Sequence, residues 1–208
     1  MDTTVSGGAE PFDLTGGELS LDFVNTLSGR KGGGVRERLV DYGSLLAWAQ
    51  QTGSLSAEQV ARLRTEARQR PTDAAGVVQR AWALREAVHG LHTAGLAGRE
   101  MSPAELAVLN GELSLAQSAL RLESGPSGLE WRWGGDEGDL SRVLWPVVRA
   151  AAVLLSGAEL GRVRECASES CGWLFLDHSR NQSRRWCDMQ SCGNRAKVRR
   201  HRQAHSHS

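Results

Sequence analysis

The sequence predicts a mainly α-helical fold with a minor β component (α+β). We expect a helical N-terminal domain with one β-hairpin, then a small four-cysteine module built from a strand or hairpin plus a C-terminal helix. Apolar residues recur at helical spacing through most of residues 41–157. Residues 119–135 instead alternate apolar and polar side chains on both sides of SGPSG. All four cysteines lie within residues 166–192, which predicts two domains, 1–161 and 162–208.

The first elements of the helical domain are short. Residues 1–17 are acidic and contain glycine and proline, so we expect a loosely ordered arm. Residues 18–27, ELSLDFVNTL, form either a strand or a helix, because periodicity does not decide between them. A glycine-rich connection follows. Residues 41–53 then predict a short helix that ends at Gly53 and has an apolar face of Leu45, Leu46, Trp48 and Ala49.

Start and stop signals delimit the next two helices. Ser56 and Gln59 have the spacing of a capping box, and we expect the helix that they begin to end at Pro71. Residues 72–95 predict a long amphipathic helix. Its apolar face comprises Val77, Ala81, Leu84, Val88 and Leu91.

The rest of the helical domain contains two helices around the hairpin. Ser102 is an N-cap and Pro103 stands at the first helical position, which predicts a helix over 102–120. Its inward face comprises Leu106, Leu109, Leu113 and Leu120. In the hairpin, Leu129, Trp131 and Trp133 share one face. Residues 139–157 predict a last helix, kinked or restarted at Pro146. Most tryptophans are interpreted as packing residues.

Composition and charge indicate a globular protein with a basic end. The chain is 40% hydrophobic and 24% charged. Its longest apolar run is far shorter than the roughly 18–20 residues of a membrane span, and we expect a cytoplasmic protein because no secretory signal is visible. Residues 1–161 hold 15 Lys and Arg against 20 Asp and Glu, a net −5, whereas residues 162–208 hold 10 against 4, a net +6. An acidic body thus carries a basic module, which favours a polyanionic partner.

The cysteine spacing predicts a zinc site. Two C-x4-C pairs are separated by 15 residues, so that each short loop supplies two thiolates to one tetrahedral ion. Ligation would also stabilise a module with few apolar side chains. Buried free thiols and two disulfides are the alternatives, and His178 is an alternative ligand. The expected zinc ligands are Cys166, Cys171, Cys187 and Cys192.

A basic helix, followed by a disordered tail, is expected directly after the last cysteine. Arg195, Arg199 and Arg202 fall on one face of it, while Lys197 and Arg200 point away and would reach phosphates only at its margins. Three arginines of the loop between the cysteine pairs could add phosphate contacts, namely Arg180, Arg184 and Arg185. A solvated charged helix is the alternative interpretation. The metal-anchored stripe favours nucleic acid, most of all DNA.

The pattern C-x4-C-G-W-L-F-x-D-x-S-x-N-x-S-R-R-W-C-x-M-x-x-C-G-N-R-x-K over residues 166–197 resembles the CGNR zinc finger family. LDFVNT at 21–26, with the helix-rich body, resembles the ABATE domain that precedes this finger in stress-induced bacterial transcription regulators. The two resemblances together cover most of the chain. They imply a regulator whose finger binds zinc through the four cysteines and binds DNA, with CGNR at the start of the finger's helix.

Several residues of the finger keep two interpretations. Asn194 either caps a turn or contacts adenine. Arg195 either binds guanine or phosphate, or forms a structural ion pair with Asp177 or Asp188. Trp173 and Trp186 either form the small core of the finger or stack on bases of a single strand.

The function of the helical domain is open between two roles. Asp22 and Asn25 are candidate polar groups of a ligand pocket or interface; alternatively the segment packs on the helices and Asn25 satisfies backbone groups. The domain would then sense a small-molecule effector or mediate homodimerisation, without a membrane partner. The sequence has no paired carboxylates, nucleophile elbow or phosphate loop, so we predict no enzyme. The finger and its basic helix predict a DNA-binding regulator. The alternatives are a zinc-stabilised RNA-binding or protein-interaction module and, third, an enzyme that uses a pocket of the body.

Overall fold

The computed structural model describes residues 10–32 and 34–205, apart from the side chains of residues 200, 204 and 205. Part of the expected N-terminal arm, residues 1–9, and the end of the C-terminal tail, residues 206–208, lie outside the described residues. The expectation of a loose arm is wrong for the described part. Phe12 exchanges two hydrogen bonds of 2.7 Å with the side chain of Gln51, because its main-chain N–H and carbonyl match the amide group.

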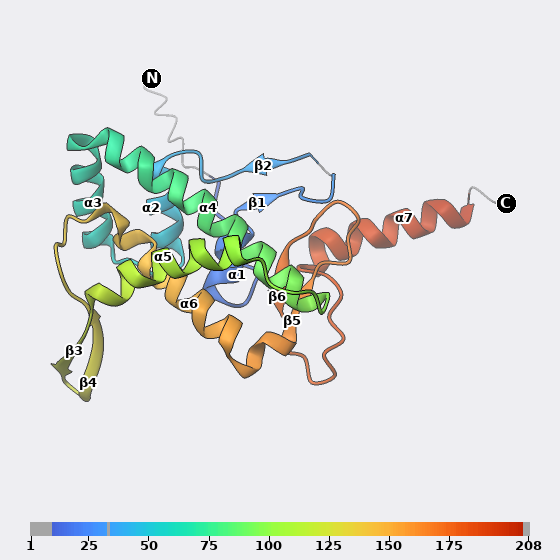
Figure 1. The fold of residues 1–208 in the computed structure, drawn as a ribbon. Helices are drawn as coiled ribbons and strands as arrows, with labels where there is room; N and C mark the ends of the chain where they lie inside the picture. The colour runs from blue at the N-terminus through green and yellow to red at the C-terminus, as the bar shows by residue number, and fades with distance from the viewer. Residues whose placement is uncertain (1–9, 33, 206–208) are drawn as a thin grey trace, which may run out of the picture.

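Among the described residues, six α-helices form the N-terminal body, and the longest of them lies at its centre (Figure 1). Helix α4 packs against each of the other five. Its residues Leu84, Val88 and Leu91 are fully buried, as expected from their spacing. The helices are α1 (Leu19–Val24), α2 (Tyr42–Gln51), α3 (Ala57–Gln69), α4 (Pro71–Leu96), α5 (Pro103–Ala119) and α6 (Trp145–Ser156).

Local capping explains where these helices begin. Capping boxes are present at Asp41, with Ser44, and at Ser56, the second as predicted. Glu18 caps α1, so the ambiguous segment 18–27 is a helix followed by a short strand.

Two prolines lie at helix starts. The helix predicted to end at Pro71 ends at Gln69, which confirms the stop, and Pro71 is the first residue of α4, where its missing N–H costs nothing. Pro146 is the second residue of α6 and follows a 3-10 turn, Leu140–Val143, which confirms the restart.

Over residues 10–32 and 34–205, three two-stranded antiparallel sheets complete the fold. Strands β3 (Leu120–Gly125) and β4 (Gly128–Trp133) form the predicted hairpin, with Leu122 opposite Trp131. Only the base of its apolar face is packed, where the Trp133 ring lies 5.7 Å from that of Trp145; Trp131 is 55% exposed. The other pairs are β1 (Leu27–Ser28) with β2 (Arg36–Glu37), and β5 (Val163–Glu165) with β6 (Leu174–Leu176). Helix α7 (Asn194–His205) ends the described chain.

The buried residues form two clusters. The main cluster joins the six helices and also includes Val163, Leu174 and Leu176 from β5 and β6. The second consists of the four cysteines and Phe175, with Trp173 and Trp186 packed against it. The strands of the finger therefore contribute one face to the body and the other to the cysteines, as alternating side chains do. Within the described part of the chain, no helix is long and apolar enough to cross a bilayer.

Candidate metal centre and nucleic-acid interface

The four cysteines come from two loops that the hairpin β5–β6 holds together. Cys166 follows β5, and its main-chain N–H donates to the carbonyl of Trp173 at 2.8 Å, which closes the first loop. The second loop is tied to the first where Ala167 N–H donates to the carbonyl of Arg185 at 2.9 Å. Cys192 lies in a π-helical turn, Met189–Gly193, that Asp188 caps. These contacts bring residues from both C-x4-C pairs together.

The sulfur atoms have the arrangement of a four-thiolate metal site. All four lie within 4.8 Å of one another, and all four cysteines are buried and outside any disulfide. The Sγ atoms are 3.7 Å apart between Cys171 and Cys187, and 3.6 Å apart between Cys187 and Cys192. A tetrahedron of sulfurs with Zn–S bonds of about 2.3 Å has edges of roughly 3.8 Å. The residues present therefore fit zinc in size and in donor chemistry.

The proximity of the sulfurs also perturbs their protonation. Hydrogen bonds from the Cys171 and Cys187 thiols lower the pKa of Cys166 far below its usual range. The same contacts with Cys166 raise the pKa of Cys171 to about 12 and raise that of Cys187 further. Sulfurs this close cannot all ionise by themselves, whereas a divalent cation deprotonates the thiols that ligate it.

Arg195 lies against the metal centre. Its Nη2 donates to Sγ of Cys192 at 3.1 Å, and this contact raises the pKa of the guanidinium. The sequence interpretation offered DNA or an ion pair with Asp177 or Asp188 as its partner. The sequence interpretation did not consider the sulfur of Cys192 as the partner of Arg195. Residues i and i+3 are neighbours on a helix, but a zinc ligand was not weighed as a hydrogen-bond acceptor.

Arg184 is engaged inside the finger. Its guanidinium carbon lies 4.4 Å from the centroid of the Phe175 ring, and its nitrogens donate to the carbonyls of Thr15, Trp186 and Cys187. Its main-chain N–H donates to the buried carboxylate of Asp177 at 2.9 Å. Asp177 also accepts from the N–H of Ser179 at 2.9 Å, so it closes the loop that carries Arg180. Arg184 thereby ties the loop to the main chain at Thr15.

The other predicted nucleic-acid residues are mostly at the surface. Helix α7 projects away from the body in Figure 1. A groove of about 530 Å³ lies along one of its faces, lined by Gln190, Ser191, Asn194, Arg195, Val198, Arg199 and Arg202. Nδ2 of Asn194 donates to the carbonyl of Gln190 at 2.9 Å, which is the capping role. Arg199 pairs with the exposed Glu169 of the first cysteine loop at 3.2 Å.

The remaining basic residues belong to α7 or to the loop between the cysteine pairs. Lys197 is exposed on α7, and Arg180 is exposed in the loop between the cysteine pairs. The guanidinium carbon of the exposed Arg185 lies 5.3 Å from the ring centroid of Trp186. Arg200 belongs to α7, but its side chain is outside the described residues.

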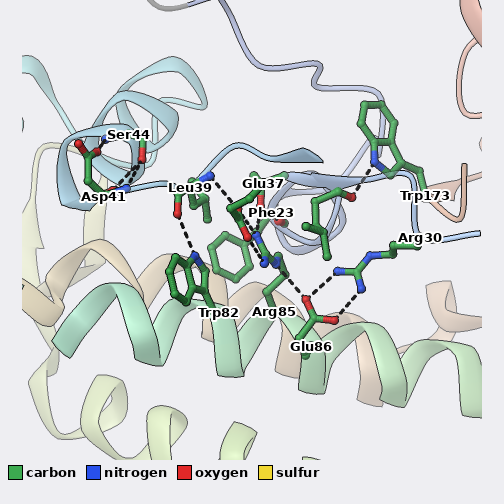
Figure 2. Close-up of polar contacts among 12 residues, drawn as sticks. Phe23, Arg30, Glu37, Leu39, Asp41, Ser44, Trp82, Arg85, Glu86 and Trp173 are labelled. Atoms are coloured by element: carbon green, nitrogen blue, oxygen red, sulfur yellow. Dashed lines mark hydrogen bonds and ion pairs between the residues drawn. The ribbon is translucent and has the colours of Figure 1, made fainter. Parts of the chain in front are cut away.

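Both tryptophans of the finger pack against the cysteine cluster. The indole N–H of Trp173 donates to the carbonyl of Leu27 at 3.0 Å, so this ring also links the finger to β1 (Figure 2). The neighbouring Arg30 pairs with Glu86 of α4 at 2.6 Å, and its main-chain N–H donates to the carbonyl of Cys171 at 3.1 Å. Local sequence patterns did not indicate these links, because their partners are 56 to 146 positions apart along the chain.

Asp22 and Asn25 lie at the same junction. The buried side chain of Asn25 bonds to both main-chain groups of Leu174, the arrangement in which Asn25 satisfies backbone groups. Oδ1 of Asp22 accepts from the N–H of Gly16 at 2.7 Å. Burial raises the pKa of Asp22 to about 6.

Comparison with known families agrees with this architecture. The ABATE family, described as "Putative stress-induced transcription regulator", matches residues 17–158. The CGNR zinc finger family matches residues 162–205. A search of curated proteins finds no match. Together with the four buried sulfurs, the second match establishes zinc as the metal of this centre.

Proposed function

The chain belongs to the ABATE family and carries a CGNR zinc finger, and from this premise we propose that it is a DNA-binding transcriptional regulator. In this proposal Cys166, Cys171, Cys187 and Cys192 ligate zinc, and α7 contacts duplex DNA. The body senses a small-molecule effector or mediates homodimerisation. Such a regulator works in the cytoplasm, where bacterial DNA lies, and catalyses no reaction.

The observation that carries the proposal is the position of α7. The helix has 12 residues and starts two positions after Cys192, so that zinc ligation fixes where it begins. It projects from the body (Figure 1), and a groove lined by Arg195, Arg199 and Arg202 lies along one of its faces. An isolated helix of this length is marginal in water, and anchoring at one end supplies the missing order. A projecting α-helix of this kind has the dimensions to enter the major groove of DNA.

Different basic residues would have different roles in such a complex. Arg199 and Arg202 line the groove and are proposed to contact DNA directly, the first after exchanging Glu169 for a phosphate. Lys197, Arg200, Arg180 and Arg185 are proposed to contact phosphates at the margins. Asn194, Arg195 and Arg184 hold the scaffold through the contacts described above, and we assign them positioning roles beside any DNA contact.

The proposal is tested by removing the two terminal arginines of the groove. Arg199→Ala with Arg202→Ala should weaken binding to duplex DNA fragments and keep one zinc per chain. Each lost phosphate contact should make the slope of log K against log salt less negative by about 0.9. A matched control is Arg64→Ala with Arg68→Ala, two exposed arginines of α3 that remove the same charge from the body. Equal weakening by both pairs, or none by the first, would contradict the proposal.

Binding measurements of the same kind distinguish DNA from the alternative partners, RNA or another protein. Val198 and Met189 are 49% and 63% exposed beside the basic groove, which favours an apolar partner surface as the second candidate. Fluorescent duplex DNA should be displaced by unlabelled duplex and not by single-stranded RNA of the same sequence. A protein partner would give binding with little dependence on salt, since the phosphate term would be missing.

A further inference from the structure

An apolar pocket of about 420 Å³ opens on the body between α2, α3 and α4. Helices α2 and α3 lie at the end of the body opposite to α7 (Figure 1). The buried side chains of Leu46, Ala74 and Val78 line the pocket. Small residues, among them Gly43 and Ala75, leave the space open. The volume falls within the range of about 300–1,000 Å³ that is usual for small-molecule sites.

Hydrogen bonds fix two sides of this pocket. The indole N–H of Trp82 donates to the carbonyl of Leu39 at 2.8 Å, which holds the ring as a wall. Asp41 accepts from the main-chain N–H of Ser44 at 2.7 Å and lines the pocket at the start of α2. Figure 2 shows both contacts, with Trp82 beside Leu39 and Asp41 beside Ser44. The pocket therefore has a preformed wall and one acidic group.

Two arginines of α3, Arg64 and Arg68, line the pocket as well. They are one helical turn apart, and like charges at this spacing destabilise a helix. Both are exposed, and neither guanidinium forms a hydrogen bond or ion pair with any residue in the described part of the chain. The neighbouring arginines of the same segment behave differently, since Arg62 pairs with Glu58 and Glu137, and Arg70 pairs with Glu66.

We propose that this pocket binds an amphipathic anion, a molecule with an apolar chain and one carboxylate or phosphate head group. The apolar chain of the ligand would lie against Leu46, Val78 and Trp82, where the wall of the pocket is mostly apolar. The head would pair with Arg64 and Arg68, because a guanidinium matches both kinds of oxyanion in a bidentate geometry. Asp41 repels an anion, so the head group is directed to α3. This inference rests on the proposed sensing role of the body, but it concerns binding alone and involves no DNA.

The test is calorimetric titration of the zinc-loaded full chain with decanoate below its micellar concentration. Decanol tests the apolar chain of the ligand without its charged head group, and acetate tests the head group without the apolar chain. Decanoate should bind, decanol should bind at least tenfold more weakly, and acetate should give no heat of binding. Decyl phosphate identifies the head group: if it binds more tightly than decanoate, the anion is a phosphate; otherwise it is a carboxylate.

Variants then locate the site. Arg64→Gln with Arg68→Gln should weaken decanoate at least tenfold and leave decanol unchanged. Ala75→Trp should abolish binding of both, because the exposed position tolerates a large side chain that fills the pocket. Arg199→Gln with Arg202→Gln removes the same charge from α7 and should change neither. The proposal is overturned if decanoate does not bind, if decanol binds equally well, or if the two double variants behave alike. Loss of DNA binding in any variant bears only on the proposed function.

Discussion

The side-chain amide of Asn25 pairs with the main chain of Leu174 as a neighbouring strand would. Its Nδ2 donates to the Leu174 carbonyl at 2.8 Å, and its Oδ1 accepts from the Leu174 N–H at 3.0 Å. The two residues are 149 positions apart. Leu176, two residues further along β6, is also bound by the N-terminal segment. Its main-chain N–H donates to the carbonyl of Gly16 at 2.7 Å. The finger is therefore joined to the body by strand-like hydrogen bonds in addition to the shared core.

Replacing Asn25 should weaken this junction. Asn25→Ala leaves one buried N–H and one buried carbonyl of Leu174 without partners, so we expect a loss of about 2–4 kcal/mol in the free energy of unfolding. Urea denaturation followed by circular dichroism measures it. Asn110→Ala, at an exposed position of α5, is the matched control and should change stability by less than about 0.5 kcal/mol. Equal effects of the two substitutions would show that the junction contributes little.

Loss of the metal tests the boundary predicted near residue 161. Cys187→Ser removes one ligand from a centre whose zinc contributes on the order of 10 kcal/mol to folding. We expect α7 and the loops that carry the cysteines to unfold, DNA binding to be lost, and the helices of the body to remain. Circular dichroism should lose a signal corresponding to about the 12 residues of α7. If the whole chain melts with the finger, the shared packing of Val163, Leu174 and Leu176 makes the two parts one cooperative unit.

Most of the fold was predictable from local patterns. The capping box at Ser56, the restart at Pro146 and the hairpin around residues 125–128 each depend on neighbours within a few positions. Pro71 separates α3 from α4, as predicted, because a proline is excluded from a helix interior but accepted at its first turn. Only Arg70 lies between the two helices.

The metal centre was predictable in its residues, but its surroundings were not. Cysteine spacing indicates ligation because two short loops around one ion leave few other arrangements. Arg184 and Arg185 are adjacent and look equivalent, yet the first lies over Phe175 inside the finger and the second is exposed. That difference arises from the buried Asp177, which positions the loop. Long-range contacts of this kind leave no local pattern.

Arg195 should tune the affinity for zinc as well as any contact with DNA. Arg195→Ala removes the donor to the Cys192 sulfur, and loss of such a partner of a metal ligand typically lowers affinity 10–100-fold. Competition with a chromophoric chelator measures the change. Arg202→Ala is the matched control, since Arg202 lines the same groove, and only Arg195 has a sulfur partner in the described part of the finger. Unchanged zinc affinity in Arg195→Ala would assign this side chain to DNA alone.

His92 should make stability depend on pH. Its ring is fully buried in α4, and neither ring nitrogen has a hydrogen-bond partner among the described residues. Burial lowers its pKa from 6.5 to about 4, and the nearby His89 adds to this effect. In the unfolded chain His92 therefore binds a proton below about pH 6.5, whereas in the folded chain it binds one only below about pH 4. The contribution of neutral His92 to the free energy of unfolding is therefore complete above pH 6.5 and is lost as the pH falls. At pH 5 the loss amounts to about 2 kcal/mol.

His92→Phe removes this titration and replaces the ring by an apolar one of similar size. We expect the free energy of unfolding of the variant, relative to the parent chain, to rise by about 2 kcal/mol between pH 7 and pH 5. Urea denaturation of both proteins at each pH measures the difference. Asp22 acts in the opposite direction, since its raised pKa makes stability fall as the pH rises from about 4 to 6. Its contribution is common to both proteins and cancels, so parallel curves for parent and variant would show that His92 is accessible to protons in the folded state.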